Sequence, residues 1–382
     1  MKPLRKVSLG EFVPTFLTSQ RVQAALTSGQ ITYGPISYTF EDEFANIHQC
    51  KHGIASSSGT SALAAALQAL KQERGWSDGS RIIVPALTFV ASVNAVIQNN
   101  LEPILVDIDD TFTIDCRGLA LAVADPSVVG IMPVHLFGNP CNMEYILEIA
   151  APHDIAIIED CCEAFSAHIG DKRVGSFGDV GCFSTYAGHH ICTGVGGMST
   201  TNDSKLASTI RSIVNHGIDP SQIPSGGTYD PSVLARVFRF TSTGRSDRIT
   251  ELQAAIGIDQ LTTWERRTEQ RQKNAQCLRA ILNGHDEIEL MVENGNGCSY
   301  MVFPFKVRSH KNTHFIKALA KNGIQSRMAM PLTNQPCYTF NEDDFPVAKE
   351  MNDHGVYVGC HEYLDRDDME YVGETILEII ND

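Results

Sequence analysis

The sequence lacks an excess of positive charge. Its 382 residues include 30 Lys and Arg against 45 Asp and Glu, which gives a formal net charge of -15. Binding to nucleic acid or to an anionic membrane surface needs a basic face, so neither partner is expected. No apolar run reaches the roughly 18 residues of a membrane-spanning helix. The start, MKPLRKVSLGEF, has no apolar signal-peptide core, and we expect a cytoplasmic protein.

Several motifs for nucleotides and metals are also missing. No P-loop occurs and no GxGxxG follows a strand, so nucleotide hydrolysis and nicotinamide chemistry lack support. The eleven cysteines form no CxxC pair and no closely spaced C-x-C motif, which favours reduced, mostly buried thiols over disulfides or an iron–sulfur cluster. His189 and Cys192 have HxxC spacing, but no second pair completes a zinc site. We therefore expect no metal.

The composition is that of a folded enzyme, with 43% hydrophobic and 20% charged residues. From about residue 51 to 202, short apolar runs alternate with helical patterns, which predicts an α/β domain with a mostly parallel sheet. The predicted helices include 60–70 and 143–151. The predicted strands are 81–86, 103–107, 128–134 and 155–160.

The second half of the chain predicts a smaller unit. The stretch DPSQIPSGGTYDPS after Gly217 reads as a surface loop. A long helical pattern over 249–282 follows, as a bridge to strands at 300–307 and 324–330 and helices at 314–321 and from 367. We predict a large domain over 1–250, and a bridging helix with a small α+β domain over 251–382.

Two segments carry candidate chemistry. Ser57, Ser58, Gly59 and Thr60 precede an alanine-rich helix, whose free amides suit a phosphate; the same residues also serve as ordinary helix caps. In IIEDCCEAFSA, Asp160 and Glu163 follow an apolar strand, at the edge where α/β sheets bind ligands. Acids at that place also begin ordinary loops, so neither segment decides the function alone.

Read in order, these segments resemble the DegT/DnrJ/StrS sugar aminotransferase family. The resemblance runs from about residue 10 to 372 through the following motifs: SGQITYGPISYTFEDEFA, SSSGTSAL, VPALTFVAS, IIEDCCEAFSA, NHGI, RITELQAAIGIDQL and GIQSRMAMPLTNQPCY. It implies an aspartate-aminotransferase-like large domain (PLP fold type I), a homodimer with shared active sites, and pyridoxal 5'-phosphate (PLP) or pyridoxamine 5'-phosphate (PMP) as cofactor.

The resemblance also implies roles for individual residues. Ser58, Gly59, Thr60 and Ser184 would hold the cofactor phosphate. Phe89 would lie against the pyridine ring, Asp160 would pair with its protonated nitrogen, and Glu163 would lie near its hydroxyl.

The chain departs from the family at the residue that bonds the cofactor. Registering TGVGG on the family pattern puts His189 where members have lysine. Imidazole forms no stable Schiff base, but its reference pKa of about 6.5 suits proton transfer. The 3-dehydratases of nucleotide-linked 4-keto-6-deoxy sugars, typified by GDP-4-keto-6-deoxymannose 3-dehydratase, share this exchange. The resemblance thus implies loss of the sugar's C3 hydroxyl, with His189 as acid and base and glutamate recharging the cofactor.

Other positions qualify this interpretation. His216 would be a second active-site histidine near the sugar, whereas His190 is interpreted as structural. Ser246 replaces an asparagine that usually reaches the partner subunit's cofactor phosphate, and nothing explains Val195 in place of an acid. Two alternatives remain: an aminotransferase that works without a covalent lysine, and a non-catalytic homologue that binds sugar or cofactor. An intact set of cofactor residues speaks against the second.

Overall fold

A seven-stranded sheet forms the centre of the large domain. The computed structural model describes residues 5–222 and 239–381. The strands of this sheet are β1 (His52–Ser56), β2 (Arg81–Pro85), β3 (Glu102–Val106), β4 (Val128–Ile131), β5 (Ala156–Asp160), β8 (Val180–Ser184) and β9 (Gly197–Thr201). Their order is β1-β9-β8-β5-β4-β2-β3. The pairs β2–β3, β2–β4, β4–β5 and β5–β8 are parallel, and only β9 runs against its neighbours.

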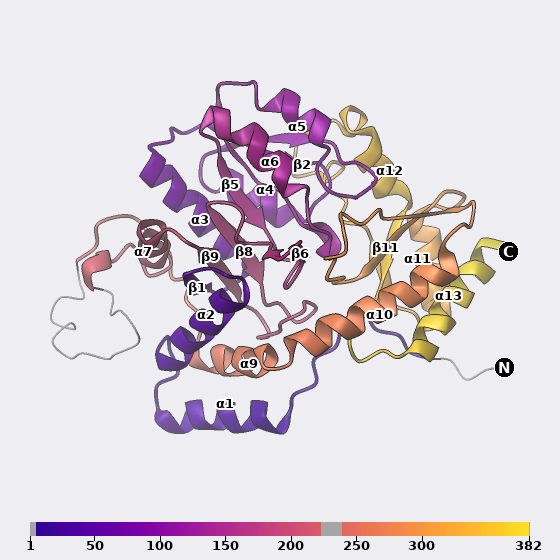
Figure 1. Cartoon of the computed structure of the whole chain (residues 1–382), viewed down its shortest axis with the longest axis horizontal. Helices are drawn as coiled ribbons and strands as arrows, with labels where there is room; N and C mark the ends of the chain where they lie inside the picture. The colour runs from indigo at the N-terminus through magenta and orange to yellow at the C-terminus, as the bar shows by residue number, and fades with distance from the viewer. Residues whose placement is uncertain (1–4, 223–238, 382) are drawn as a thin grey trace.

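Helices cover this sheet and connect it to the small domain (Figure 1). Those of the first half are α1 (Phe16–Ser28), α2 (Pro35–Ile47), α3 (Gly59–Arg74), α4 (Val90–Ile97), α5 (Cys116–Ala122), α6 (Met143–Ala150) and α7 (Ser204–Ile213). Those of the second half are α9 (Glu251–Leu261), α10 (Trp264–Leu282), α11 (Asn312–Lys321), α12 (Pro346–His354) and α13 (Arg366–Asn381).

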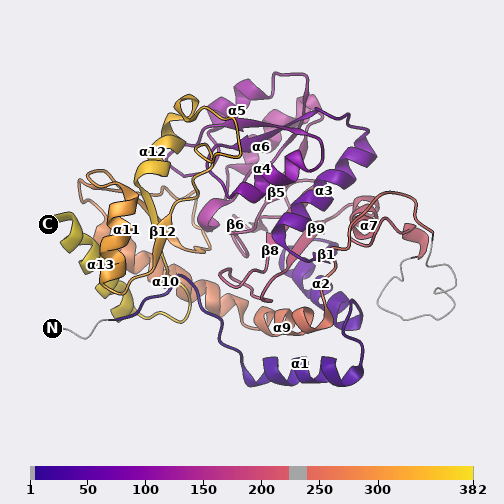
Figure 2. The same ribbon diagram turned by 180° about the vertical axis from the view of Figure 1, so that it is seen from behind.

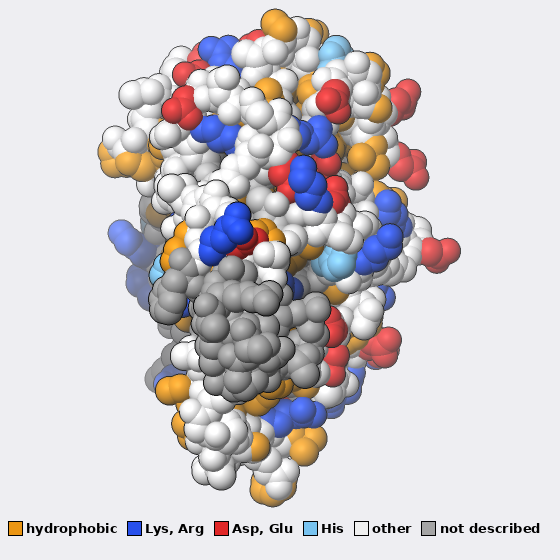
Figure 3. All heavy atoms as spheres, turned by 90° about the vertical axis from the view of Figure 1, so that its left-hand side faces the viewer, with side chains coloured by type: hydrophobic (Ala, Val, Ile, Leu, Met, Phe, Trp, Pro, Cys, Tyr) orange, Lys and Arg blue, Asp and Glu red, His pale blue; other side chains and the backbone are white. Residues whose placement is uncertain are grey.

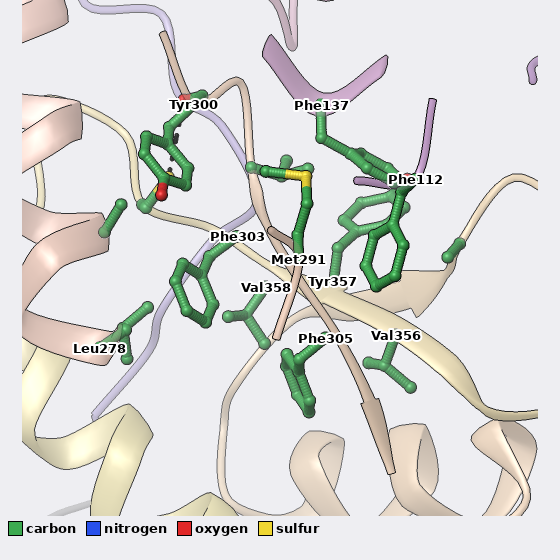
Figure 4. Close-up of a cluster of buried hydrophobic side chains, with 14 of the residues drawn as sticks. Phe112, Phe137, Leu278, Met291, Tyr300, Phe303, Phe305, Val356, Tyr357 and Val358 are labelled. Carbon is green, nitrogen blue, oxygen red and sulfur yellow. Dashed lines mark hydrogen bonds between the residues drawn. The ribbon is translucent and has the colours of Figure 1, made fainter. Parts of the chain in front are cut away.

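The small domain is built on an antiparallel sheet of order β10-β11-β13-β12. Its strands are β10 (Ile288–Leu290), β11 (Phe303–Val307), β12 (Ser326–Met328) and β13 (Gly355–Val358); a separate two-stranded hairpin is formed by β6 (His168–Ile169) and β7 (Lys172–Arg173). One apolar cluster joins the two domains, because Phe112 and Phe137 pack beside Tyr357 of β13 (Figure 4).

Two polar connections also tie the domains together. Asp107, after β3, accepts hydrogen bonds of 2.9 Å from the amides of Val347 and Ala348 at the start of α12, which lies beside the large domain in Figure 2. The N-terminal segment pairs with the small domain, since Val7 forms a parallel bridge with Ile324. The division of the chain at residue 250 stays a prediction.

The fold class predicted from the sequence is confirmed, and all four predicted strands of the large sheet are present. One difference concerns the helical pattern over 249–282, which is two helices. The chain turns at Thr262 and Thr263 between α9 and α10, where the Thr262 hydroxyl bonds the Asp259 carbonyl. The loop predicted after Gly217 falls largely on 223–238, outside the described residues.

Two further observations concern the cysteines and the helices. All eleven cysteines are free thiols, and seven of them are buried. Among the described residues, no helix has both the length and the apolar character needed to cross a membrane.

Candidate active site

The first turn of α3 forms the candidate phosphate loop. Ser58 is the N-cap, and its hydroxyl accepts a 3.0 Å hydrogen bond from the amide of Ser61. The amides of Gly59 and Thr60, the first two residues of α3, have no acceptor within the helix. They point out of the positive end of the helix dipole, which suits an anion.

Glycine at position 59 permits the start of α3, the end of β8 and the turn after β5 to approach one another closely. A Cβ atom at Gly59 would lie 2.7 Å from Sγ of Cys162 and 2.8 Å from Cβ of Ser184. A Cβ at Gly197 would lie 2.2 Å from the carbonyl oxygen of Ser58. The predicted phosphate ligands Ser58, Gly59 and Ser184 are therefore brought together with the turn after β5.

Asp160 ends β5, a strand whose five residues are all buried. One carboxylate oxygen accepts a 2.7 Å bond from the Ser92 hydroxyl, and the other a 3.1 Å bond from the amide of Cys162. Burial raises the pKa of this carboxyl, and these two bonds oppose the rise. Both partners are neutral, so a cationic group that approached Asp160 would stabilise its charged form.

Glu163 follows Asp160 by three residues in the chain and is also buried. Its Oε2 accepts a 3.0 Å hydrogen bond from the amide of Phe137, a residue with a positive φ of 57°. Burial raises the pKa of Glu163 to about 7; the Phe137 amide opposes this rise and the charge of Asp160 adds to it. The carboxyl can therefore gain or lose a proton near neutrality.

His189 stands in the connection between β8 and β9. Its Nδ1 lies 2.6 Å from the carbonyl oxygen of Cys162. A carbonyl only accepts, so Nδ1 must carry the proton and Nε2 keeps its lone pair. Burial lowers the pKa of His189 to about 4, with the charge of Arg271 as a smaller contribution in the same direction. At neutral pH the ring is thus an uncharged base through Nε2.

Two aromatic side chains are exposed close to these groups. Phe89, the residue before α4, is 58% exposed, and Tyr186 is 56% exposed. Tyr186 packs edge-on against His189, with ring centroids 6.0 Å apart and planes at 84°. Large aromatic faces at the surface are typical of places where a flat ligand binds.

The remaining predicted residues lie outside this group or serve another purpose. His190 is buried, and its Nε2 bonds the Ser299 carbonyl at 3.1 Å, which fits a structural role. His216 is exposed, with φ of 63°, and no hydrogen bond joins its imidazole to the other predicted site residues across the described chain. Ser246 is exposed as well and pairs with Asn215. Next to it, the Asp247 carbonyl accepts a 2.6 Å bond from the Ser57 amide.

One cluster has the residue types of a metal site but uses its donor atoms otherwise. His135, Glu159 and Cys161 are buried, with their candidate ligand atoms within 4.8 Å of one another. The Glu159 carboxylate accepts three backbone amide bonds of 2.8 Å, from Gly175, Phe177 and Gly178. His135 accepts from the amide of Cys141 through Nδ1 and donates to Glu159 through Nε2. The cluster is a hydrogen-bonded support beneath the site.

The sequence interpretation missed two groups that the structure places here. Ser92 bonds Asp160 from the first turn of α4, and its position inside VPALTFVAS was a usable signal. The carbonyl of Cys162, which sets the His189 tautomer, had none, because a backbone oxygen carries no side-chain signature.

The arrangement fits a phosphorylated pyridine cofactor. It offers helix amides without an acceptor beside Gly59, where a larger residue would collide with its neighbours. It also offers a buried acid that forms no ion pair among the described residues, and an exposed aromatic ring. Position 189 holds a histidine and not a lysine.

Comparisons with known proteins agree with this. Residues 17–377 match the DegT/DnrJ/EryC1/StrS aminotransferase family. GDP-perosamine synthase of Caulobacter vibrioides is 34% identical over 357 residues, covering 89% of each chain. GDP-4-keto-6-deoxy-D-mannose 3-dehydratase of Escherichia coli O55:H7 is 29% identical over 377 residues, covering 94% of this chain and 96% of the relative. The solved E. coli dehydratase with bound hydrated PLP superposes with a TM-score of 0.90 at 28% identity, covering 98% of this chain and 100% of the other.

Fold and site thus define a PLP-dependent enzyme of fold type I, which confirms the predicted cofactor. The chain belongs to the DegT/DnrJ/EryC1/StrS aminotransferase family, whose members are sugar-modifying enzymes.

Proposed function

We propose that this protein is a PLP/PMP-dependent 3-dehydratase that acts on a nucleotide-linked 4-keto-6-deoxy sugar. The observation that carries the proposal is His189 at the register of the family's lysine, with Nδ1 bonded to the Cys162 carbonyl and Nε2 available as a base. A transaminase needs its lysine to hold the cofactor covalently and to move a proton. Histidine can do only the second.

The cofactor would bind through the residues predicted from the sequence. Ser58, Gly59, Thr60 and Ser184 would hold its phosphate, Phe89 its ring face and Asp160 its ring nitrogen. Glu163 would lie near the ring hydroxyl. Bound PMP supplies an amine for the C4 ketone of the sugar and a ring that accepts an electron pair.

His189 would carry the proton transfers. Its Nε2 would act as the base, and the imidazolium so formed would be the acid that returns the proton to the departing C3 hydroxyl. The Cys162 carbonyl favours the charged ring, because its hydrogen bond from Nδ1 is stronger when the imidazole is protonated. The lowered pKa of His189 keeps the starting base neutral at pH 7.

The remaining components are proposed with this reaction. Glutamate would recharge the cofactor, and His216 would contact the sugar. The enzyme would work as a homodimer in the cytoplasm, in which the exposed Ser246 approaches the partner's cofactor phosphate. The exposure of both His216 and Ser246 in the single chain supports a shared site.

A second candidate is a nucleotide-sugar aminotransferase that works without a covalent lysine. It is favoured by the 34% identity to a GDP-perosamine synthase, which exceeds the 29% identity to the dehydratase. The missing lysine disfavours it.

Product analysis separates the candidates. Purified enzyme is given PLP, glutamate and GDP-4-keto-6-deoxymannose, and the products are identified by mass spectrometry and NMR. A 3-deoxy keto sugar supports the dehydratase, and an amino sugar overturns it in favour of the aminotransferase. If neither product forms with any 4-keto-6-deoxy nucleotide sugar tried, the non-catalytic alternative holds.

The His189→Lys variant is the matched control for the cofactor. After borohydride treatment with PLP, the intact mass of the variant should increase by one cofactor, whereas the wild-type mass should not. Trapping of wild-type protein at another lysine would show that His189 is not the cofactor-facing residue.

A further inference from the structure

The orientation of the His189 ring depends on few contacts. The Cys162 carbonyl fixes which nitrogen carries the proton. The amide of His189 donates a 2.9 Å bond to the carbonyl of Tyr186, which closes a turn over residues 186–189. The turn has free space on one side, where a Cβ atom at Gly188 would meet nothing within 4 Å, while Gly10 lies close to the Gly188 backbone on another side. Among the described residues, no side chain forms a hydrogen bond with the imidazole, whose polar partners are the backbone carbonyl of Cys162 and, through its effect on the pKa, that of Ser184.

The ring of Tyr186 provides the second constraint. It stands nearly perpendicular to the imidazole, at 84°, with the centroids 6.0 Å apart. This edge-to-face arrangement is one of the two that aromatic pairs prefer. Two hydrogen bonds hold the backbone of Tyr186. Its amide donates to the Ser184 hydroxyl at 3.3 Å, and its carbonyl accepts from the amide of His189.

Burial does not explain an aromatic residue at this position. More than half of the Tyr186 side chain is exposed, so the ring adds little to the core. No side-chain hydrogen bond of its hydroxyl is found among the described residues. What the ring does contact is the histidine.

We propose that Tyr186 is a positioning residue for the proton transfer: its ring, and not its hydroxyl, holds the His189 imidazole with Nδ1–H on Cys162 and Nε2 toward the cofactor position. The inference rests on the proposed role of His189 as acid and base. It assigns to Tyr186 a function that needs an aromatic ring but no phenol, which separates it from a proton donor.

The first test measures the tautomer without any reaction. Protein labelled with 15N-histidine is examined by NMR at pH 7, free of cofactor, and the His189 signals are assigned with His189→Gln. Wild type and Tyr186→Phe should show His189 as the Nδ1–H tautomer. In Tyr186→Leu and Tyr186→Ala a substantial Nε2–H population should appear, because the ring can then leave the Cys162 carbonyl.

The second test uses the steady-state rates with nucleotide sugar and glutamate. In Tyr186→Leu and Tyr186→Ala, kcat should fall about tenfold, a part of the roughly 10²- to 10⁴-fold that a positioned acid–base group contributes. KM should change less than about twofold, and Tyr186→Phe should keep both values. Equal thermal midpoints and PMP affinities in all variants would show that the fold and the cofactor site are intact.

Two results would overturn the proposal. If Tyr186→Ala keeps the wild-type tautomer, the ring does not position the histidine. If Tyr186→Phe is as slow as Tyr186→Ala, the hydroxyl is the active group. A wild-type protein that forms no product contradicts the proposed function instead, and the NMR measurement still decides the role of Tyr186.

Discussion

At the scale of single residues, the site contains two groups whose pKa values shift in opposite directions. Burial moves the pKa of His189 down to about 4 and that of Glu163 up to about 7. Both shifts disfavour charge, as expected for desolvated groups. Below pH 7 and above pH 4, His189 and Glu163 are therefore both mainly uncharged.

The raised pKa of Glu163 predicts a pH-dependent stability. The ordinary value of 4.5 describes the unfolded chain, and about 7 the folded one. Between these values the folded protein holds a proton that the unfolded chain has lost. The contribution of Glu163 to the free energy of unfolding is thus largest below pH 4.5 and disappears as pH rises through 7, at no more than about 1.4 kcal/mol per pH unit.

Glu163→Gln removes this titration. Urea unfolding of cofactor-free wild type and variant, at pH 5 and at pH 7.5, measures it. The free energy of unfolding of wild type relative to the variant should be lower at pH 7.5 than at pH 5 by about 2 kcal/mol. A difference that does not depend on pH would mean that Glu163 is ionised throughout, with an ordinary pKa.

At the scale of elements, the phosphate loop depends on how closely α3, β8 and the turn after β5 approach one another. In Gly59→Ala the new methyl group would collide with Cys162 Sγ and Ser184 Cβ. We expect the loop to shift and the dissociation constant for PMP to rise at least about tenfold, or about 1.4 kcal/mol, as measured by calorimetry.

The double variant Gly59→Ala/Cys162→Ala tests this cause. Removal of the sulfur relieves one of the two collisions, so PMP affinity should recover in part but not fully, because Ser184 remains. Wild-type affinity in the single variant would show that the loop has room for a methyl group.

At the scale of the whole molecule, apolar side chains are exposed around α1, which lies beneath α9 in Figure 1. The exposed residues are Val13, Phe16, Leu17, Leu26 and Ile31. Figure 3 shows hydrophobic side chains reaching the surface at this lower end. Apolar surface gathered in one region is typical of an interface between subunits.

The proposed homodimer gives a direct prediction for this surface. Wild type should sediment as a dimer at micromolar concentration, and Phe16→Glu/Leu17→Glu should dissociate because charge replaces apolar contact. Leu121→Glu is the matched control, since that residue is 80% exposed on α5, away from α1. A monomeric wild type would contradict the dimer, and an equal effect of the control would point to general destabilisation.

The sequence determined the fold class and indicated most residues of the candidate site. Apolar runs that end in Asp160, and the serine before an alanine-rich helix, are local patterns whose physics does not depend on distant residues. Four of the seven strands of the large sheet were therefore predicted. The histidine in place of lysine was visible because the following glycines fix its register.

The tertiary structure decided what depends on contacts between distant segments. The protonated nitrogen of His189 follows from a carbonyl 27 residues away in the chain. The pKa of Glu163 follows from burial beside Phe137, and the turn that separates α9 from α10 was hidden in a continuous helical pattern. Burial, tautomer and ring packing are properties of surroundings that only the folded chain creates, whereas residue type and spacing are written in the sequence.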